Sequence, residues 1–248
     1  MSNKVVVITG ASSGIGAALG EYLSARGMSV VLVARRKEQL EEVASRCNGH
    51  ALVIAADVTV RAEVKRVVDT ALAQFNHIDV WVNNAGQGIT RVPSQLTDED
   101  VDFMITSNVK SALYGMQEAL PHFKARGTGH VINISSLLGR VPYVPFRSAY
   151  CGAKHFLNGL TATFRTEVQQ THPDIQFSLV SPGVVQTEFG LRALHGGPDS
   201  RALPDSQTVE EVVEVIAGVI ESRQPDVYTR KGVRDRIVGY YAGAGVDP

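Results

Sequence analysis

Short runs of apolar residues alternate with longer, amphipathic segments along most of the chain. Each apolar run has the length of a strand that is buried on both faces of a sheet. The longer segments repeat apolar residues at helical spacing and carry charged residues between them. We expect strands at residues 5–9, 30–33, 52–56, 78–82, 129–134, 175–180 and 226–228.

The longer segments predict helices that follow the strands in turn. We expect helices at residues 17–26, 37–46, 61–74 and 97–126, then one that carries residue 150 and ends near 170, and a last one at 208–222. Strands that alternate with helices of this length form βαβ units with parallel strands. No composition shift or linker divides residues 1–248, so the sequence predicts one α/β domain.

Residues 188–207 differ from the rest of the chain because they are rich in glycine, proline and charge and show little periodicity. A loop this long within a compact domain is usually functional. We therefore expect a substrate lid at about 188–207.

The charge balance excludes several classes of partner. The formal net charge is −1 and no long run of lysine and arginine occurs, which argues against nucleic acid or an anionic membrane as the main partner. The longest apolar runs are strand-sized, so we expect no membrane span. Residues 1–4 lead directly into the first strand, which is not the pattern of a signal peptide.

The cysteines and histidines indicate neither disulfide nor metal chemistry. Cys47 and Cys151 lie far apart and form no C-x-x-C motif, so we expect reduced thiols in a cytoplasmic protein. The seven histidines show no ligand spacing, and we propose no metal site.

A glycine-rich turn connects the first strand to the first helix, with the pattern T-G-x-x-x-G-x-G over residues 9–16. Glycines let the backbone turn tightly and approach a pyrophosphate, and the helix N-terminus then offers free N–H groups and a positive dipole. The alternative is an ordinary glycine-rich turn, and the turn alone does not separate the two interpretations.

Tyr150 and Lys154 are four residues apart, so on a helix they share one face. A lysine ammonium beside a phenol favours the phenolate and lowers the tyrosine pKa from about 10. Tyr150 is therefore a candidate proton donor and acceptor near neutral pH. The alternative is an aromatic residue and a solvated lysine on a helix surface.

Asn108 lies inside the helix expected from Thr97 towards Arg126. Asparagine is a poor residue for a helix interior because its amide competes for backbone partners. Asn108 either faces solvent or marks a local kink that aims a carbonyl or holds a water.

Four motifs follow one another in an order that resembles the short-chain dehydrogenase/reductase family over almost the whole chain. They are the turn at 9–16, the sequence Asn-Asn-Ala-Gly at 83–86, the serine pair 135–136 ahead of Tyr150 and Lys154, and Pro-Gly at 182–183 with Thr187 beyond. The resemblance implies a doubly wound Rossmann fold, with a seven-stranded parallel sheet and helices on both faces.

The resemblance also implies catalytic roles for four residues. Tyr150 would exchange a proton with the substrate oxygen, and Lys154 would lower the tyrosine pKa and bind the nicotinamide ribose. Ser136 would hydrogen-bond the same substrate oxygen and steady the developing oxyanion. Asn108 would hold a water that links Lys154 to solvent.

Cofactor contacts are implied at the glycine-rich turn, at the ends of three later strands and at the catalytic pair. These residues are Gly10, Gly14, Ile15, Gly16, Asp57, Val58, Asn84, Ala85, Gly86, Tyr150, Lys154, Pro182, Gly183, Val185 and Thr187. Asn83 is expected instead to form a structural bridge between strands.

The choice of catalytic serine has an alternative. Ser136 lies fourteen residues before Tyr150, one more than in many relatives, which leaves Ser135 as the other candidate. Alternation along a strand sends the two hydroxyl groups to opposite faces, so only one can reach the site. We expect that residue to be Ser136.

The residues that follow the second strand indicate which nicotinamide cofactor the protein binds. In this fold an acid after that strand binds both ribose hydroxyls of NAD. Here Arg35 and Arg36 follow it, and Asp57 cannot replace the acid because it ends the third strand. The Arg35 guanidinium would match a 2′-phosphate, and Ser12 or Ser13 could add a hydroxyl, whereas Arg36 could be only solvated. We therefore expect NADP(H) rather than NAD(H), the alternative being two solvated arginines.

Together these features predict an NADP(H)-dependent alcohol dehydrogenase or carbonyl reductase acting on a secondary alcohol or ketone of small or medium size. The loop after the serine pair carries leucine and aromatic residues, which suggests a hydrophobic substrate. The alternative is a non-enzymatic nicotinamide-nucleotide sensor. We also expect a homo-oligomer, a tetramer or dimer, because two long helices carry surplus apolar residues. These are Leu113, Met116, Phe156, Leu160 and Phe164.

Overall fold

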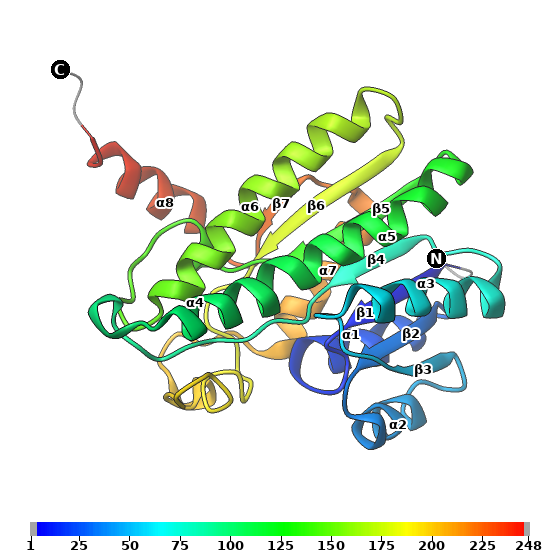
Figure 1. Ribbon diagram of the computed structural model, residues 1–248, viewed down its shortest axis with the longest axis horizontal. Helices are drawn as coiled ribbons and strands as arrows, with labels where there is room; N and C mark the ends of the chain where they lie inside the picture. The colour runs from blue at the N-terminus through cyan, green and yellow to red at the C-terminus, as the bar shows by residue number, and fades with distance from the viewer. Residues whose placement is uncertain (1–3, 246–248) are drawn as a thin grey trace.

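Seven strands form one parallel sheet in a computed structural model of the protein that describes residues 4–245. The strands are β1 (Val5–Thr9), β2 (Ser29–Ala34), β3 (Ala51–Ala55), β4 (Val80–Asn83), β5 (Gly129–Ile134), β6 (Ile175–Ser181) and β7 (Asp226–Tyr228). Their order in the sheet is β3-β2-β1-β4-β5-β6-β7, so the chain reverses its direction of growth between β1 and β4. This arrangement confirms the predicted doubly wound Rossmann fold (Figure 1).

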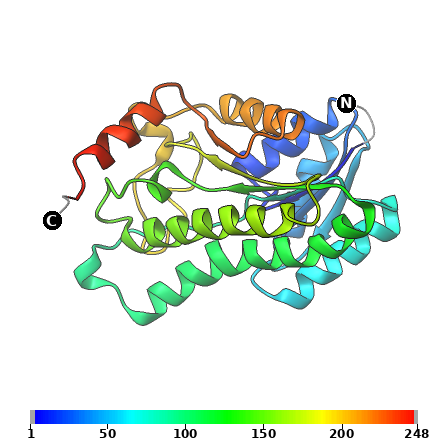
Figure 2. The same cartoon turned by 90° about the horizontal axis from the view of Figure 1, so that it is seen from above.

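Helices cover both faces of the sheet (Figure 2). They are α1 (Gly14–Ser24), α2 (Lys37–Ser45), α3 (Arg61–Phe75), α4 (Asp98–Ile105), α5 (Ser111–Arg126), α6 (Ser148–Gln169), α7 (Val209–Ser222) and α8 (Val233–Ala242). The first, second and seventh pack on one face, and the third, fifth and sixth on the other. Within residues 4–245 no helix combines the length and the apolar composition that crossing a bilayer requires.

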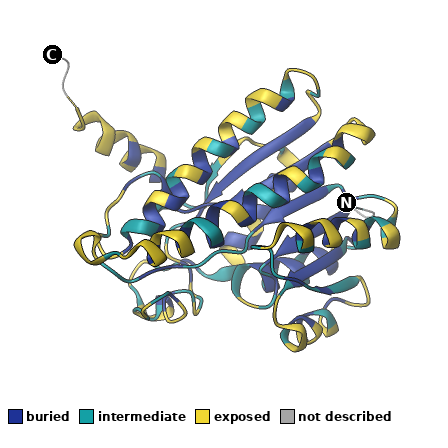
Figure 3. Cartoon of the chain, viewed as in Figure 1, coloured by how far each residue is buried: buried dark blue, intermediate teal, exposed yellow. Residues whose placement is uncertain are grey.

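Alternation within each strand supplies both halves of the core. In β1, Val6 and Ile8 pack towards α1 and α7, whereas Val5 and Val7 pack towards α3 and α5. The central strands are therefore buried on both sides, as Figure 3 shows by the dark blue sheet between helices that are exposed only on their outer faces. This is the reason that the strands appear in the sequence as continuous apolar runs.

The helix expected at 97–126 is divided in the structure. Thr97 caps α4 through a reciprocal capping box with Asp100, and a π-helical segment at Thr106–Lys110 then separates α4 from α5. Asn108 lies in this segment and is 1% exposed, so the solvent-facing alternative is wrong. Its side chain hydrogen-bonds the backbone of Gln87, after β4, from within this locally widened stretch of helix.

The helix α8 was not predicted from the sequence. Its residues Val233 and Ile237 pack on Val141, while Val238 and Tyr241 on its outer side stay exposed. A helix with so narrow an apolar stripe has a weak periodic signal. It extends from the body of the molecule at one end, as Figures 1 and 2 both show.

Candidate active site

The main cavity of the structure opens where the carboxyl ends of the strands meet, and its volume is about 1220 Å³. Ligands of this fold class bind at that edge, beside the point where the strand order reverses. The cavity is lined by all but two of the residues that the sequence proposed for the site. The two exceptions are Gly16 and Asn108, which support the lining from behind.

The glycine-rich turn has the backbone shape that a dinucleotide site needs. Gly10 and Gly14 have φ angles of +67° and +57°, which favour glycine. A Cβ on Gly16 would lie 2.5 Å from Asn84 Nδ2 and from the Gly10 oxygen, so the turn and the end of β4 close on each other. Asn84 Nδ2 also donates to the Thr9 oxygen over 2.9 Å. The turn therefore fits a pyrophosphate against the N-terminus of α1.

Two arginines contact the serines of this turn, and a third lines the same cavity. Arg36 donates to Ser12 Oγ at 2.8 Å and to Ser13 Oγ at 3.1 Å, and Arg192 lies 3.5 Å from Ser13 Oγ. Burial, and then the charge of Arg192, lower the pKa of Arg36. Arg35 stays more exposed, with its guanidinium 4.0 Å from Asp57. Positive groups that converge in this way suit a phosphate.

The structure favours a different arginine for the phosphate site than the sequence did. The sequence favoured Arg35 and allowed that Arg36 was only solvated, but Arg36 is the one that contacts the turn. Arg192, on the 188–207 segment, was not singled out because no local motif connects it to a turn 179 residues away.

Tyr150 and Lys154 are both buried in the cavity wall, at 7% and 4% exposure, so the surface alternative is wrong. Burial raises the pKa of Tyr150 to about 12, and a hydrogen bond with Ser136 and the charge of Arg147 act against this rise. Burial also lowers the pKa of Lys154 to about 8. Lys154 Nζ donates to the Ile134 oxygen at 2.9 Å and lies 5.6 Å from the centre of the Tyr150 ring.

The expected lowering of the Tyr150 pKa by Lys154 is therefore wrong for this structure. The ammonium is directed at a backbone carbonyl, and loss of hydration is the larger effect on the phenol. At neutral pH the phenol holds its proton, which is the form that can donate.

Asn108 supports Lys154 indirectly. Its Nδ2 donates to the oxygens of Gln87 and Met104, and its Oδ1 accepts from the Gln87 N–H. A Cβ on Gly86 would lie 2.8 Å from Asn108 Oδ1 and 3.5 Å from Lys154 Nζ, so a glycine is needed between them. Because the amide is occupied by protein partners, a water held here would bond to main-chain groups of the π-helical segment.

The two serines have different surroundings although both line the cavity. Ser135 Oγ donates to Asn158 Oδ1 at 2.5 Å, and Asn158 in turn donates to the Gly139 oxygen at 2.7 Å. Ser136 Oγ accepts from the Leu138 N–H at 3.1 Å and lies beside Tyr150. Ser135 is thus part of the loop structure, and Ser136 is the serine placed with the tyrosine.

The 188–207 segment forms one wall of the cavity. Phe189 lies against the Tyr150 ring, with 5.5 Å between the ring centres. The segment is tied to the chain after β4 by backbone hydrogen bonds between Leu194 and residues 88–90, and His195 bonds the buried Asp100 at 2.7 Å. This contact gives His195 a structural partner.

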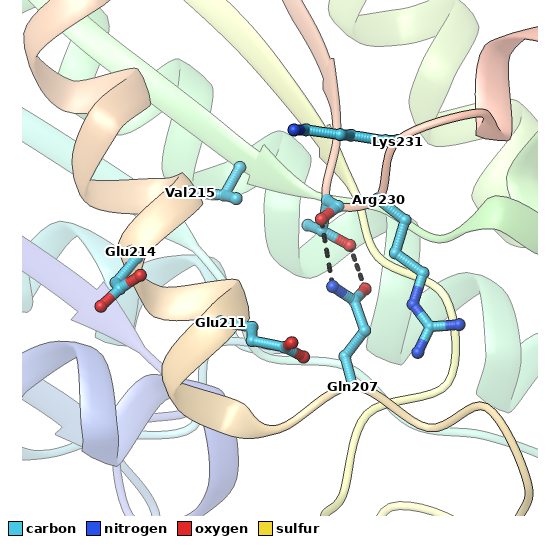
Figure 4. A pocket seen from close by; sticks show the side chains of 7 residues that line it. Gln207, Glu211, Glu214, Val215, Arg230 and Lys231 are labelled. Atoms are coloured by element: carbon cyan, nitrogen blue, oxygen red, sulfur yellow. Dashed lines mark hydrogen bonds between the residues drawn. The ribbon is translucent and has the colours of Figure 1, made fainter.

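A second hollow of about 460 Å³ lies outside this site, between α7 and the turn after β7 (Figure 4). Gln207 at its base is held by Thr229, and its sides carry Glu211, Arg230 and Lys231. Charges of both signs around an open hollow specify no ligand.

A parallel sheet with such a turn defines a nucleotide-binding protein of the Rossmann class. Within that class, residues 4–194 match the model of the short chain dehydrogenase family. An uncharacterized oxidoreductase from Staphylococcus epidermidis is 37% identical over 201 residues, which are 77% of this chain and 85% of that protein. The chain belongs to the short-chain dehydrogenase/reductase family.

Solved structures agree in fold. A short-chain dehydrogenase/reductase from Burkholderia phymatum in complex with NAD matches with a TM-score of 0.88 and 22% identity, covering 100% of this chain and 98% of the other. An alcohol dehydrogenase from Thermococcus sibiricus complexed with 5-hydroxy-NADP matches with a TM-score of 0.79 and 26% identity, over 94% and 98% of the two chains.

Alanine at each serine should separate catalysis from structure. We expect Ser136→Ala to lower kcat by about 10²–10³ on the ketone reduced fastest in a panel, because an oxyanion donor is lost. Ser135→Ala should lower the free energy of unfolding by about 1–3 kcal/mol with little effect on kcat, because Asn158 Oδ1 loses its buried partner. A larger loss of kcat in the folded Ser135→Ala variant would reverse the assignment.

Lys154→Met should stabilise the protein at pH 7 in the absence of ligand. The folded state holds the lysine proton less tightly than the unfolded chain, so the buried charge costs stability below pH 8 and this cost falls as the pH rises towards 10.5. A fall of the pKa from 10.5 to about 8 corresponds to about 3 kcal/mol.

Chemical denaturation between pH 7 and 9.5 measures this effect. The gain of Lys154→Met over the wild type should shrink with rising pH, while the exposed Lys124→Met control shows no such trend. A Lys154→Met variant less stable than the wild type at pH 7 would contradict the assigned cost.

Proposed function

We propose that the protein is an NADP(H)-dependent oxidoreductase that interconverts a secondary alcohol and a ketone on a hydrophobic substrate of small or medium size. The observation that carries the proposal is the burial of Tyr150, Ser136 and Lys154 together in the wall of the cavity that also contains the glycine-rich turn. A nucleotide sensor has no need to bury these three polar side chains together with so few hydrogen-bond partners.

The residues divide the chemistry between them. In the reductive direction the Tyr150 phenol donates its proton to the substrate oxygen, and Ser136 donates a hydrogen bond to the same oxygen. Bound nicotinamide supplies or accepts the hydride. Lys154 lies behind the tyrosine, where it would hydrogen-bond the nicotinamide ribose.

Several residues would hold the cofactor. The turn at 9–16 and the N-terminus of α1 receive the pyrophosphate, and Asp57 and Val58 border the adenine. Ser12, Ser13 and Arg36 lie together, as expected for a 2′-phosphate site with Arg35 beside it. Similar structures contain either NAD or an NADP derivative, so the preference rests on these residues.

We further propose that residues 1–248 act as one domain in which 188–207 is the substrate lid, and that the protein is a cytoplasmic dimer or tetramer. Among the apolar residues named for an interface, Phe156 is 56% exposed on α6 and fits this role. Met116 does not, because it is fully buried against the sheet.

A ketone panel with NADPH tests the activity. We expect consumption of NADPH by the wild type, and a kcat lower by about 10²–10⁴ for Tyr150→Phe because the proton donor is removed. Cofactor affinity, measured by calorimetry, should stay close to that of the wild type. Tight binding of NADPH with no turnover of any ketone, followed in both directions, would favour the sensor instead.

Cofactor choice should depend on the arginines. We expect Arg36→Ala and Arg35→Ala each to lower kcat/KM for NADPH by about 10- to 150-fold, the value of a charged hydrogen bond of about 1.5–3 kcal/mol. The value for NADH should not fall. Arg46→Ala is the control, because Arg46 pairs with Glu21 away from the cavity. A wild type that prefers NADH would contradict the NADP(H) assignment.

A further inference from the structure

Arg147 is a buried arginine in the wall of the candidate active site. It is 8% exposed and precedes Tyr150 by three residues, at the start of α6. Its NH1 donates to the Ile89 oxygen at 2.9 Å, and its guanidinium lies 5.6 Å from the centre of the Phe146 ring. The side chain lines the same cavity as Tyr150 and Ser136.

No carboxylate of residues 4–245 lies within ion-pair distance of Arg147. The acidic residues around it are engaged elsewhere. Asp100 pairs with Arg91 and His195, Glu188 pairs with Arg192 and Arg201, and Asp199 pairs with Arg201.

An unpaired buried charge is expensive. Its effective cost in a protein is several kcal/mol, and an arginine cannot avoid it by losing its proton. Burial lowers the pKa of Arg147, with the charge of Tyr150 acting the other way. A neutral side chain with an N–H group could also donate to the Ile89 carbonyl. This hydrogen bond therefore does not explain why a charged side chain is buried at position 147.

The backbone packs closely on this guanidinium at two glycines. A Cβ on Gly88 would lie 2.9 Å from Arg147 NH1, and a Cβ on Gly197 would lie 3.2 Å from NH2. The same Gly197 position is 2.8 Å from Thr90 Oγ1 and 2.7 Å from the Gly190 oxygen. Thr90 Oγ1 is buried and has no hydrogen-bond partner among the described residues. Two polar groups with unused bonding capacity thus meet beneath the 188–207 segment.

We propose that Arg147 binds a carboxylate of the substrate, which makes the substrate a keto acid or hydroxy acid with an apolar body. This inference rests on the proposed oxidoreductase function and names the substrate class. The guanidinium has N–H groups besides the one that Ile89 accepts, and these could donate to a carboxylate. Phe146 and Phe189 supply the apolar surroundings of the substrate body. The substrate carboxylate supplies the negative charge that no described residue of the protein places beside Arg147.

Binding of a dead-end pair tests the proposal without turnover. With NADPH present, the alcohol 4-(1-hydroxyethyl)benzoate cannot react, and 4-(1-hydroxyethyl)benzamide is its neutral counterpart. Calorimetry of the wild type should give an affinity for the acid about 10- to 150-fold above that for the amide, the range expected for a charged hydrogen bond. Equal affinities, including no measurable binding of either compound, would overturn the proposal.

Three variants assign the preference to Arg147. Arg147→Gln keeps a donor for Ile89 but no charge, and should bind the acid and the amide equally. Arg147→Lys should retain part of the preference. Arg165→Met is the control, because Arg165 also donates to backbone carbonyls but lies outside the cavity, and it should keep the wild-type ratio. Retention of the full preference in Arg147→Gln would overturn the proposal.

The ratio of the affinities for the acid and the amide separates carboxylate binding by Arg147 from the other roles of this residue. Arg147 also lowers the pKa of Tyr150 and holds Ile89, but either effect would change the acid and the amide alike. A merely structural arginine would show a lower thermal midpoint in Arg147→Gln with no preference for the acid in the wild type.

Turnover distinguishes this proposal from the activity on which it rests. Preferential binding of the acid with no reduction of 4-acetylbenzoate or any other ketone would refute the oxidoreductase function and leave the anion site. Reduction of ketones with no preference for the acid would refute the anion site alone.

Discussion

All strands of the sheet are parallel, and this constraint decides where the polar groups of the cavity lie. The strands of a buried parallel sheet are mainly apolar along their length, and the polar residues that line the cavity lie where the strands end. The carboxyl ends then meet at one edge. Residues as distant in sequence as Thr9 and Asn84 come into contact there, because β1 and β4 are neighbours at the point where the strand order reverses.

The cavity at this edge concentrates positive charge that the protein does not neutralise. Arg36 is exposed and donates to the two serine hydroxyls. Two charges are buried: among the hydrogen-bond partners that the described residues provide, Lys154 has the Ile134 carbonyl and Arg147 has the Ile89 carbonyl, with the Phe146 ring 5.6 Å away. The helices and sheet around them must supply enough apolar burial to tolerate these charges. Stability is therefore lowered where ligands bind, which is the usual relation between stability and activity.

The sequence predicts the features of this site that depend on local spacing. Strand periodicity, the glycine-rich turn and the four-residue spacing of Tyr150 and Lys154 all follow from short-range geometry, and the sheet and these positions agree with it. The π-helical segment could be anticipated only as a kink at Asn108, because the side chain of Asn108 bonds to Gln87, twenty-one residues earlier, and local spacing does not show this contact.

The missed residues are those whose neighbours come from another part of the chain. The sequence places Arg147 three residues before Tyr150, but only the folded structure shows that no described carboxylate pairs with it. The direction of the Tyr150 pKa was predicted wrongly for a related reason. The spacing shows that Lys154 lies near Tyr150. The pKa of Tyr150 depends on how far the phenol is buried and on whether the ammonium points at it, and here the ammonium donates to Ile134 instead.

The positive groups of the cavity would also order the proposed ligands within it. Arg36 and its neighbours stand at the glycine-rich turn, and Arg147 stands beneath the 188–207 segment beside Tyr150. A phosphate at the first place and a carboxylate at the second would fix the two ligands at their outer ends. The reacting carbon atoms would then meet in the apolar middle of the cavity, where Phe189 packs against the Tyr150 ring.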